Sequence, residues 1–176
     1  MMRKRQKSMI EKNTIFLRIA GIIEESITDG FGLRYVIFLQ GCTHKCKGCQ
    51  NPHTHDLKGG FLKDCGEILE DLRKNPLLQG VTFSGGEPLL QAKNLQILAK
   101  EIKALGLDLT LYTGYTYEEL KEVKEFYCLL ELCDVLVDGR FILEQRDLSL
   151  RFRGSTNQRL IDVQKTLSLE KIVEFH

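Results

Sequence analysis

The chain has 176 residues, a formal net charge of +1 and a hydrophobic fraction of 43%, which together fit one domain with a sizeable core. A net charge this close to zero gives no general attraction to nucleic acid or to an anionic membrane surface. No apolar run reaches the length of a membrane span, and the N-terminal residues lack the apolar segment of a signal peptide. We therefore expect a cytoplasmic protein with neither a nucleic-acid nor a membrane partner.

Residues 1–13 are basic, with five Lys or Arg residues against a single Glu. A solvated, poorly ordered terminus is the commoner meaning of such a charge run, and an arm that docks a partner is the alternative. The sequence thus predicts a disordered arm over residues 1–13 and one folded domain over residues 14–176.

The remaining sequence alternates between strand-like and helix-like segments. The predicted strands cover residues 15–23, 34–40, 81–83, 107–112, 134–137 and 160–164, and the predicted helices cover residues 64–74, 89–105, 117–127 and 168–175. Strands that alternate with helices indicate a parallel sheet with right-handed crossovers. Ligands in such folds collect at the carboxyl ends of the strands, so the loops there should hold the site.

Three cysteines follow the second predicted strand within eight residues, as Cys42, Cys46 and Cys49. Their spacing would also place them on one face of a helix, which is the packing interpretation. The glycines at positions 41 and 48 and the Gln-Asn-Pro run at 50–52 are typical of turns instead. A loop that presents three thiols is therefore favoured.

Thiols in a reducing compartment usually bind a metal or react, which disfavours a disulfide here. Zinc would take a fourth ligand, for which His44, His53 or His55 is available, so a zinc-binding structural or interaction module is the alternative of another class. Three cysteines on one short loop better suit a cubane iron-sulfur cluster that leaves one iron open for a substrate.

The loop from Cys42 to Cys49 resembles that of radical S-adenosylmethionine enzymes. Its flanks, residues 29–34 and 51–52, are similar to those of the activating enzymes of glycyl-radical proteins. Over residues 15–164 the chain resembles the subgroup that acts on anaerobic ribonucleoside-triphosphate reductase. The resemblance implies an α/β fold, an incomplete TIM-like barrel of about five to six parallel strands with flanking helices, since a complete barrel needs roughly 250 residues.

The resemblance implies two cofactors, one 4Fe-4S cluster ligated by Cys42, Cys46 and Cys49, and S-adenosyl-L-methionine. The glycine-rich motif at 84–87 is implied to hold the methionyl amino group, with Glu87 as an acceptor for the ammonium. The residues assigned to cofactor binding are Gly48, Cys49, Gln50, Ser84, Gly85, Gly86, Glu87 and Asp138. The resemblance implies that Gly48 and Gln50 contact adenine through backbone atoms, and the chain departs from the family in that neither residue beside Cys49 is aromatic.

Other polar and sulfur-containing residues are assigned less directly. Arg153, Asn157 and Arg159 are further candidates for contact with a ligand or a partner. The three histidines at 44, 53 and 55 are interpreted as lying at the surface or behind the ligands. The remaining cysteines stand alone in apolar or helix-like segments and are interpreted as structural; they are Cys65, Cys128 and Cys133.

The implied reaction is the reductive cleavage of S-adenosylmethionine to methionine and a 5'-deoxyadenosyl radical, which takes a hydrogen atom from a glycine of the partner. The implied partners are the large subunit of anaerobic ribonucleoside-triphosphate reductase and a strong reductant such as reduced flavodoxin. The open side of the barrel would admit the glycine loop. The same chemistry on another glycyl-radical enzyme or on a small molecule is the alternative.

Overall fold

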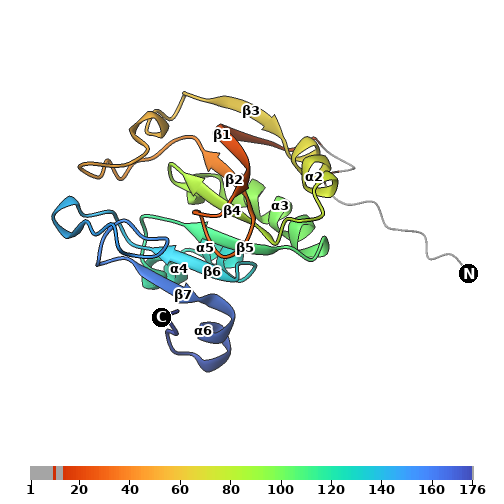
Figure 1. Ribbon diagram of the computed structural model, residues 1–176. Helices are drawn as coiled ribbons and strands as arrows, with labels where there is room; N and C mark the ends of the chain where they lie inside the picture. The colour runs from red at the N-terminus through yellow and green to blue at the C-terminus, as the bar shows by residue number, and fades with distance from the viewer. Residues whose placement is uncertain (1–9, 11–13, 176) are drawn as a thin grey trace, which may run out of the picture.

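The computed structural model describes residue 10 and residues 14–175. In that part of the chain, seven strands form one mixed sheet in the order β3-β1-β2-β4-β5-β6-β7, with helices packed against it (Figure 1). The strands are β1 (Phe16–Ser26), β2 (Arg34–Leu39), β3 (Phe61–Asp64), β4 (Gly80–Gly85), β5 (Asp108–Tyr112), β6 (Val135–Asp138) and β7 (Arg159–Asp162). The helices are α2 (Cys65–Lys74), α3 (Ala92–Ala104), α4 (Tyr117–Glu122), α5 (Lys124–Leu130) and α6 (Val163–Leu169). The predicted α/β class is confirmed.

Four central strands, β2, β4, β5 and β6, run parallel. Helices lie in each connection between them, as parallel pairing requires a long crossover. Strands β2, β4 and β6 are buried along most of their length. Burial on both faces produces the nearly continuous apolar runs from which these strands were predicted.

The parallel part of the sheet is smaller than the five to six strands predicted, because the outer strands are antiparallel. Strand β1 pairs antiparallel with both β2 and β3. The loop at 27–33 between β1 and β2 is too short for the crossover that parallel pairing would need. Strand β7 pairs antiparallel with β6. The segment at 139–158 stays at the carboxyl end of β6, so the chain re-enters the sheet from that end.

Two local features of the structure differ from the predicted elements, each for an identifiable reason. The helix predicted over 117–127 is divided into α4 and α5, because Val123 has an extended backbone with φ −115° and ψ 109°. Strand β3 was not predicted, and its outer residues Phe61 and Leu62 are exposed at the sheet edge. A short exposed edge strand lacks the apolar alternation that reveals a half-buried one.

The terminal helix predicted over 168–175 is wrong. Helix α6 begins earlier, where the Asp162 side chain accepts a hydrogen bond from the Lys165 N–H at 3.0 Å. It ends at Glu170, whose left-handed φ of 52° stops the helix. The chain then returns along β7, and the Phe175 N–H donates to the Leu160 carbonyl at 2.8 Å.

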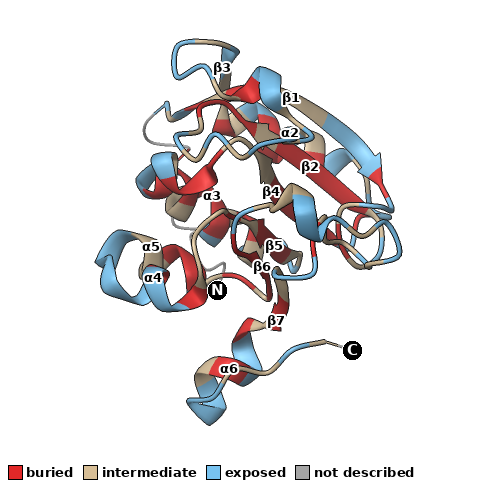
Figure 2. Ribbon diagram, turned by 90° about the vertical axis from the view of Figure 1, so that its left-hand side faces the viewer, coloured by how far each residue is buried: buried red, intermediate tan, exposed pale blue. Residues whose placement is uncertain are grey.

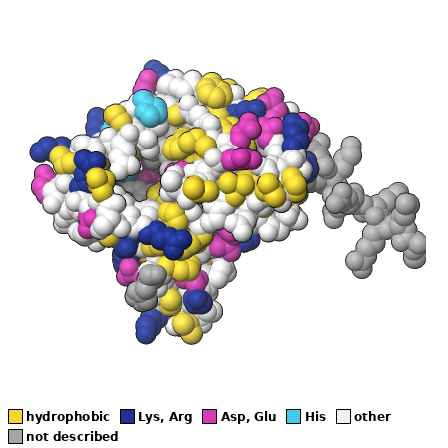
Figure 3. All heavy atoms as spheres, viewed as in Figure 1, with side chains coloured by type: hydrophobic (Ala, Val, Ile, Leu, Met, Phe, Trp, Pro, Cys, Tyr) yellow, Lys and Arg dark blue, Asp and Glu magenta, His cyan; other side chains and the backbone are white. Residues whose placement is uncertain are grey.

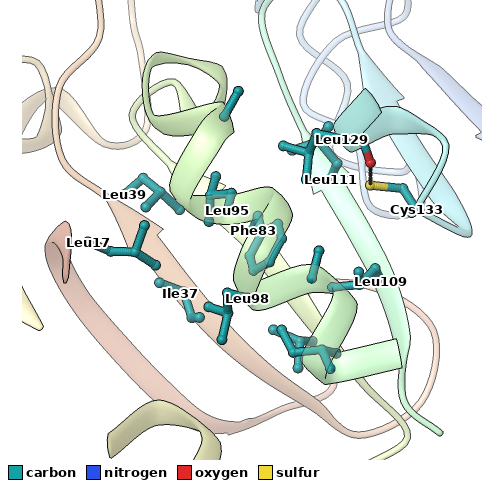
Figure 4. Close-up of a cluster of buried hydrophobic side chains, with 14 of the residues drawn as sticks. Leu17, Ile37, Leu39, Phe83, Leu95, Leu98, Leu109, Leu111, Leu129 and Cys133 are labelled. Atoms are coloured by element: carbon teal, nitrogen blue, oxygen red, sulfur yellow. Dashed lines mark hydrogen bonds between the residues drawn. The ribbon is translucent and has the colours of Figure 1, made fainter. Parts of the chain in front are cut away.

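The main core lies between the sheet and its helices. Figure 2 shows buried residues along the strands and on the inner faces of the helices. Figure 4 shows Leu95 and Leu98 of α3 packed beside Phe83 of β4. Ile10, the described residue of the basic N-terminal segment, is also buried in this core, and the rest of the arm predicted at 1–13 lies outside the described residues. Within the described residues, no helix combines the length and the apolar character needed to cross a membrane.

Two of the isolated cysteines belong to the core. Cys65 and Cys133 are fully buried, and burial raises the pKa of the Cys65 thiol to about 12. The Cys133 thiol donates to the Leu129 carbonyl at 3.3 Å (Figure 4). These contacts confirm the structural interpretation for both residues, while Cys128 is half-buried.

Arg34 connects the first parallel strand to the next two. Its side chain is fully buried and donates to the Val81 carbonyl at 2.7 Å, to the Thr82 hydroxyl at 3.2 Å and to the Thr110 hydroxyl at 3.0 Å. It also forms an ion pair with Asp108. Because these acceptors belong to β4 and β5, one guanidinium ties three strands together near their amino ends.

We predict that Arg34→Met lowers the free energy of unfolding by about 3 kcal/mol, because it leaves several buried acceptors without a donor. Urea unfolding of the purified protein measures this value. Arg73→Met, at an exposed position on α2, is the control and should change stability by less than about 0.5 kcal/mol. A loss at position 34 no larger than that of the control would contradict the prediction.

Candidate functional site

A cavity of about 530 Å³ lies at the carboxyl ends of the parallel strands. Figure 3 shows the surface hollowed near the left of the view, on the side where Figure 1 places the loops that follow β2 and β6. The cavity lining includes Cys42, His44, Cys46, Cys49, Gln50, Ser84, Gly85, Gly86, Thr113, Gly114, Gly139, Arg140, Phe141 and Arg153. The predicted convergence of the strand-end loops on one face is confirmed.

The three clustered cysteines all face this cavity and are partly exposed. The loop that carries them turns through left-handed conformations at Lys45, with φ 51°, and at Gly48, with φ 72°. The Cys49 N–H donates to the Cys46 carbonyl at 3.2 Å, which closes the second part of the loop. A loop rather than a helix therefore presents the thiols, as the sequence predicted.

The thiols have the chemistry that an iron-sulfur cluster needs. Within the described residues, no three His, Cys, Asp or Glu side chains are grouped around a single metal-ion position. In a cubane cluster each thiolate binds a different iron, so three separate thiols facing one cavity are a suitable donor set. Burial raises the pKa of the Cys42 thiol, and hydrogen bonds from the backbone of His44 and Lys45 partly offset that rise.

The glycine-rich loop after β4 lies directly against the start of the cysteine loop. Gly85 has a left-handed φ of 96°. A Cβ on Gly86 would lie 2.3 Å from the Gly41 carbonyl oxygen, and the Glu87 N–H donates to that same oxygen at 2.7 Å. The two loops therefore meet backbone to backbone, which only glycine at position 86 allows.

The Glu87 carboxylate is fully buried and accepts four hydrogen bonds. The donors are the Leu89 N–H at 3.0 Å, the Thr113 hydroxyl at 2.9 Å, the Gly114 N–H at 2.9 Å and the His44 Nε2 at 2.8 Å. Four donors match the acceptor capacity of a carboxylate. The role predicted for Glu87, acceptor of an ammonium group, stays a prediction, and its carboxylate already has a full set of partners in the protein.

The histidines were interpreted as lying at the surface or behind the ligands, and the structure separates them. The His44 side chain is only 5% exposed, and its ring packs edge-on against Tyr115 with the ring centres 4.7 Å apart. His55 lines the cavity, whereas His53 is exposed. His44 therefore lines the cavity beside the cysteines, with its side chain almost fully buried.

Asp138 is buried at the end of β6 and faces a second, smaller cavity. It accepts hydrogen bonds from the Tyr117 N–H at 2.7 Å and from the Arg159 Nε at 3.0 Å. The Arg159 guanidinium also pairs with Glu118 at 2.7 Å. In the structure the Asp138 carboxylate bonds to these protein donors. Its contact with a cofactor stays a prediction.

Of the remaining assigned residues, Gln50 and Arg153 line the larger cavity and Asn157 lines the smaller one. Gly48 packs against Leu143, whose Cδ1 would lie 2.9 Å from a Cβ at position 48. The Arg153 side chain donates to the Gln158 carbonyl at 3.1 Å, and within the described residues its buried Nε has no partner. Asn157 points elsewhere and donates to the Arg140 carbonyl at 2.8 Å.

Comparison with known proteins places the chain in a family. The family described as 4Fe-4S single cluster domain matches residues 28–161. The anaerobic ribonucleoside-triphosphate reductase-activating protein of Haemophilus influenzae is 39% identical over 140 residues, which are 75% of this chain and 89% of that protein. The chain belongs to this family. Proteins of the same name from Escherichia coli strain K12 and from Enterobacteria phage T4 are each 36% identical over 141 residues, covering 75% of this chain and 90% and 85% of theirs.

Among solved structures, QueE from Escherichia coli is similar, with a TM-score of 0.46 and 18% sequence identity over 57% of this chain and 54% of that chain.

In this family member, sequence reasoning did not assign a role to Thr113 and Gly114, although it placed them at the end of a strand beside the site. Both line the cavity and both donate to Glu87. The signal in the sequence was their position after β5, at the same sheet edge as the glycine-rich loop. Their joint acceptor could be recognised only from the folded arrangement.

The ion pair between Glu118 and Arg159, at the smaller cavity, is predicted to make a pH-dependent contribution to the stability of the fold. The Arg159 guanidinium lowers the pKa of Glu118 to about 2, from about 4.3 in an unfolded chain. Because the folded-state pKa is lowered, the pair stabilises the protein above about pH 4.3, and this contribution is lost as the pH falls toward 2. The Glu118 side chain is 59% exposed, so Glu118→Gln should cost about 1 kcal/mol or less at pH 7.

Urea unfolding at several pH values between 7 and 2 measures this contribution, with Glu122→Gln at an exposed position of the same helix as the control. The stability difference between wild type and Glu118→Gln should shrink over the acidic part of this range. A difference that stays constant down to pH 2 would contradict the assignment.

Proposed function

We propose that this protein is an iron-sulfur oxidoreductase that activates anaerobic ribonucleoside-triphosphate reductase by generating a glycyl radical on it. The observation that carries the proposal is the placement of three thiols, from Cys42 to Cys49, in one cavity with the glycine-rich loop after β4. Membership of the reductase-activating family supports the choice of partner.

Cys42, Cys46 and Cys49 would hold the 4Fe-4S cluster, and S-adenosylmethionine would occupy the adjoining cavity, whose volume of about 530 Å³ is within the usual range for small-molecule sites. When bound, these groups supply the one-electron cleavage of the sulfonium and the radical that removes a hydrogen atom from glycine. The protein contributes orientation of the cofactor and exclusion of water.

Different loops would contact different parts of S-adenosylmethionine. Residues Ser84 to Gly86 would present backbone atoms to the methionyl amino group, because their glycines let a ligand approach closely. The backbone beside Gln50 would contact adenine at the rim of the cavity. Contact of Glu87 with the methionyl ammonium and of Asp138 with the cofactor belong to this proposal, and both carboxylates would also hold their loops in place through bonds to protein donors.

The sheet would act as an incomplete barrel of the radical S-adenosylmethionine type, open on one side to the glycine loop of the reductase. Its order, with β3 and β7 as the two edges, supports an open arrangement. The cavity lies at the strand ends, where such a loop would enter. Reduced flavodoxin as the electron donor, which rests on the family resemblance, and the cytoplasm as the location, which rests on the sequence, complete the proposal.

The direct test uses anaerobic protein reconstituted with iron and sulfide, then mixed with dithionite, S-adenosylmethionine and the anaerobic reductase. We expect 5'-deoxyadenosine and a glycyl doublet on the reductase by electron paramagnetic resonance. Deoxyadenosine without the doublet would refute the reductase as the partner. Neither signal, in a protein that takes up zinc instead of iron, would refute the radical chemistry.

The cysteine assignment is tested by substitution. We expect Cys46→Ala to lose the visible absorption of the cluster, most of its bound iron and essentially all cleavage of S-adenosylmethionine, because two thiolates cannot hold the cluster in the cavity. Cys128→Ala, at the half-buried cysteine on α5, is the matched control and should keep all three. Full activity of Cys46→Ala would exclude the assignment.

A further inference from the structure

We propose that His44 is a positioning residue that fastens the cysteine loop to the loops on the S-adenosylmethionine side of the cavity, through the Glu87 carboxylate. This inference rests on the proposed function and assigns a role to a histidine that the reaction itself does not use. It follows from one buried hydrogen bond, its surroundings and the placement of its two partners on different loops.

The contact between the two side chains is short and shielded from water. The His44 Nε2 lies 2.8 Å from the Glu87 Oε2, and the two side chains are 5% and 0% exposed. A hydrogen bond to a buried carboxylate is stronger than one at the surface, and losing its donor leaves the acceptor unsatisfied. His44 lies between Cys42 and Cys46, so the bond acts on the middle of the thiol loop.

Glu87 extends this connection to a third loop. The same carboxylate accepts hydrogen bonds from the Thr113 hydroxyl and the Gly114 N–H, both after β5. An ionised carboxylate can only accept hydrogen bonds, so with Glu87 ionised the His44 Nε2 is the donor. One buried anion therefore joins the loops after β2, β4 and β5, all of which line the cavity.

Steric contacts hold the imidazole ring in this orientation. A Cβ added to Gly114 would lie 2.5 Å from Cδ2 and 2.6 Å from Nε2 of His44. The three nearest atoms to that Cβ all belong to His44, so the ring occupies the space that a side chain at position 114 would need. Tyr115 packs against the ring with an interplanar angle of 71°. The ring is thus held by its hydrogen bond, by Gly114 and by Tyr115.

The arrangement sets the position of the thiols relative to the glycine-rich loop. Without the ring, Cys42 and Cys46 would remain available to a cluster, but the loop would lose its side-chain connection to the loop beginning at Ser84, while the backbone bond from Glu87 to Gly41 would remain. We therefore expect a variant that binds iron and binds S-adenosylmethionine poorly. His44→Gln can place an amide N–H near the same carboxylate, so it should recover most of the wild-type behaviour.

The first measurement needs no cofactor. In the apoprotein, amide hydrogen exchange over residues 42–50 should be at least about tenfold faster in His44→Ala than in wild type, as expected for the loss of a hydrogen bond to a buried charge. His53→Ala, at an exposed histidine beyond the cysteine loop, is the matched control and should exchange like wild type. Equal exchange in His44→Ala and wild type would overturn the proposal, whatever the protein's reaction is.

The second measurement follows the reduced cluster by electron paramagnetic resonance during titration with S-adenosylmethionine. We expect His44→Ala to retain iron close to the wild-type amount and to need about tenfold more S-adenosylmethionine for half of the spectral change, with recovery in His44→Gln. An unchanged half-saturation in His44→Ala overturns the inference. A wild-type spectrum that does not respond to S-adenosylmethionine overturns the proposed function instead, and the apoprotein measurement still decides the role of His44.

A double-variant cycle keeps the test valid if His44→Ala retains little iron. Gly114→Ala leaves every cluster thiol in place and should speed the apoprotein amide exchange over residues 42–50, because its methyl group displaces the His44 ring. In the His44→Ala background the same change should have no further effect on the apoprotein exchange, because the ring is absent. The proposal would be overturned if the two substitutions had additive effects on exchange in the double variant, or if Gly114→Ala alone left exchange unchanged.

Discussion

The buried carboxylate of Glu87 is the group on which the arrangement of the site depends. An anion without contact to water is tolerated only when its acceptor positions are filled, and here four donors fill them. These donors come from loops that follow three different strands. The requirement to satisfy one buried charge therefore fixes the distances among these loops, together with the backbone bond from Glu87 to Gly41 and the packing of His44 on Tyr115.

The buried guanidinium of Arg34 plays the corresponding part at the other end of the same strands. Arg34 begins β2 and bonds to residues at the starts of β4 and β5, where a Cβ on Gly80 would lie 2.2 Å from its Nη1. The three strands are thus connected by Arg34 at their amino ends and by Glu87 near their carboxyl ends. Between these two polar groups the strands contact one another through apolar residues such as Ile37, Phe83 and Leu111.

The parts of the fold that could be predicted are those in which local pattern and burial coincide. The apolar runs of β2, β4 and β6, the thiol loop and the glycine-rich turn were all apparent in the sequence. The direction of β7 was not, because it depends on the path of the segment at 139–158 rather than on the composition of the strand. The end of α6 was missed because it depends on one left-handed residue, Glu170.

The sequence also did not show which polar side chains bond to one another. His44 and Glu87 are 43 residues apart, and Asp138 and Arg159 are 21 residues apart. Each residue could be placed at a strand end, but strand-end position does not say which polar side chain bonds to which. Glu87 and Asp138 were expected to face a ligand, which stays a prediction, and the sequence did not reveal the protein donors to which their carboxylates bond.

The loops that form the site differ in how far along the chain their residues are separated. The three thiols lie within eight residues of one another, so bringing them together requires only the closure of a short loop. The cavity beside them draws on segments from Ile23 to Gln158, and such long-range contacts form late because chain entropy opposes them. Once β2 and the short loop that follows it have formed, the complete set of thiols is in place. The protein acquires the cavity only when β4, β5 and β6 have joined the sheet.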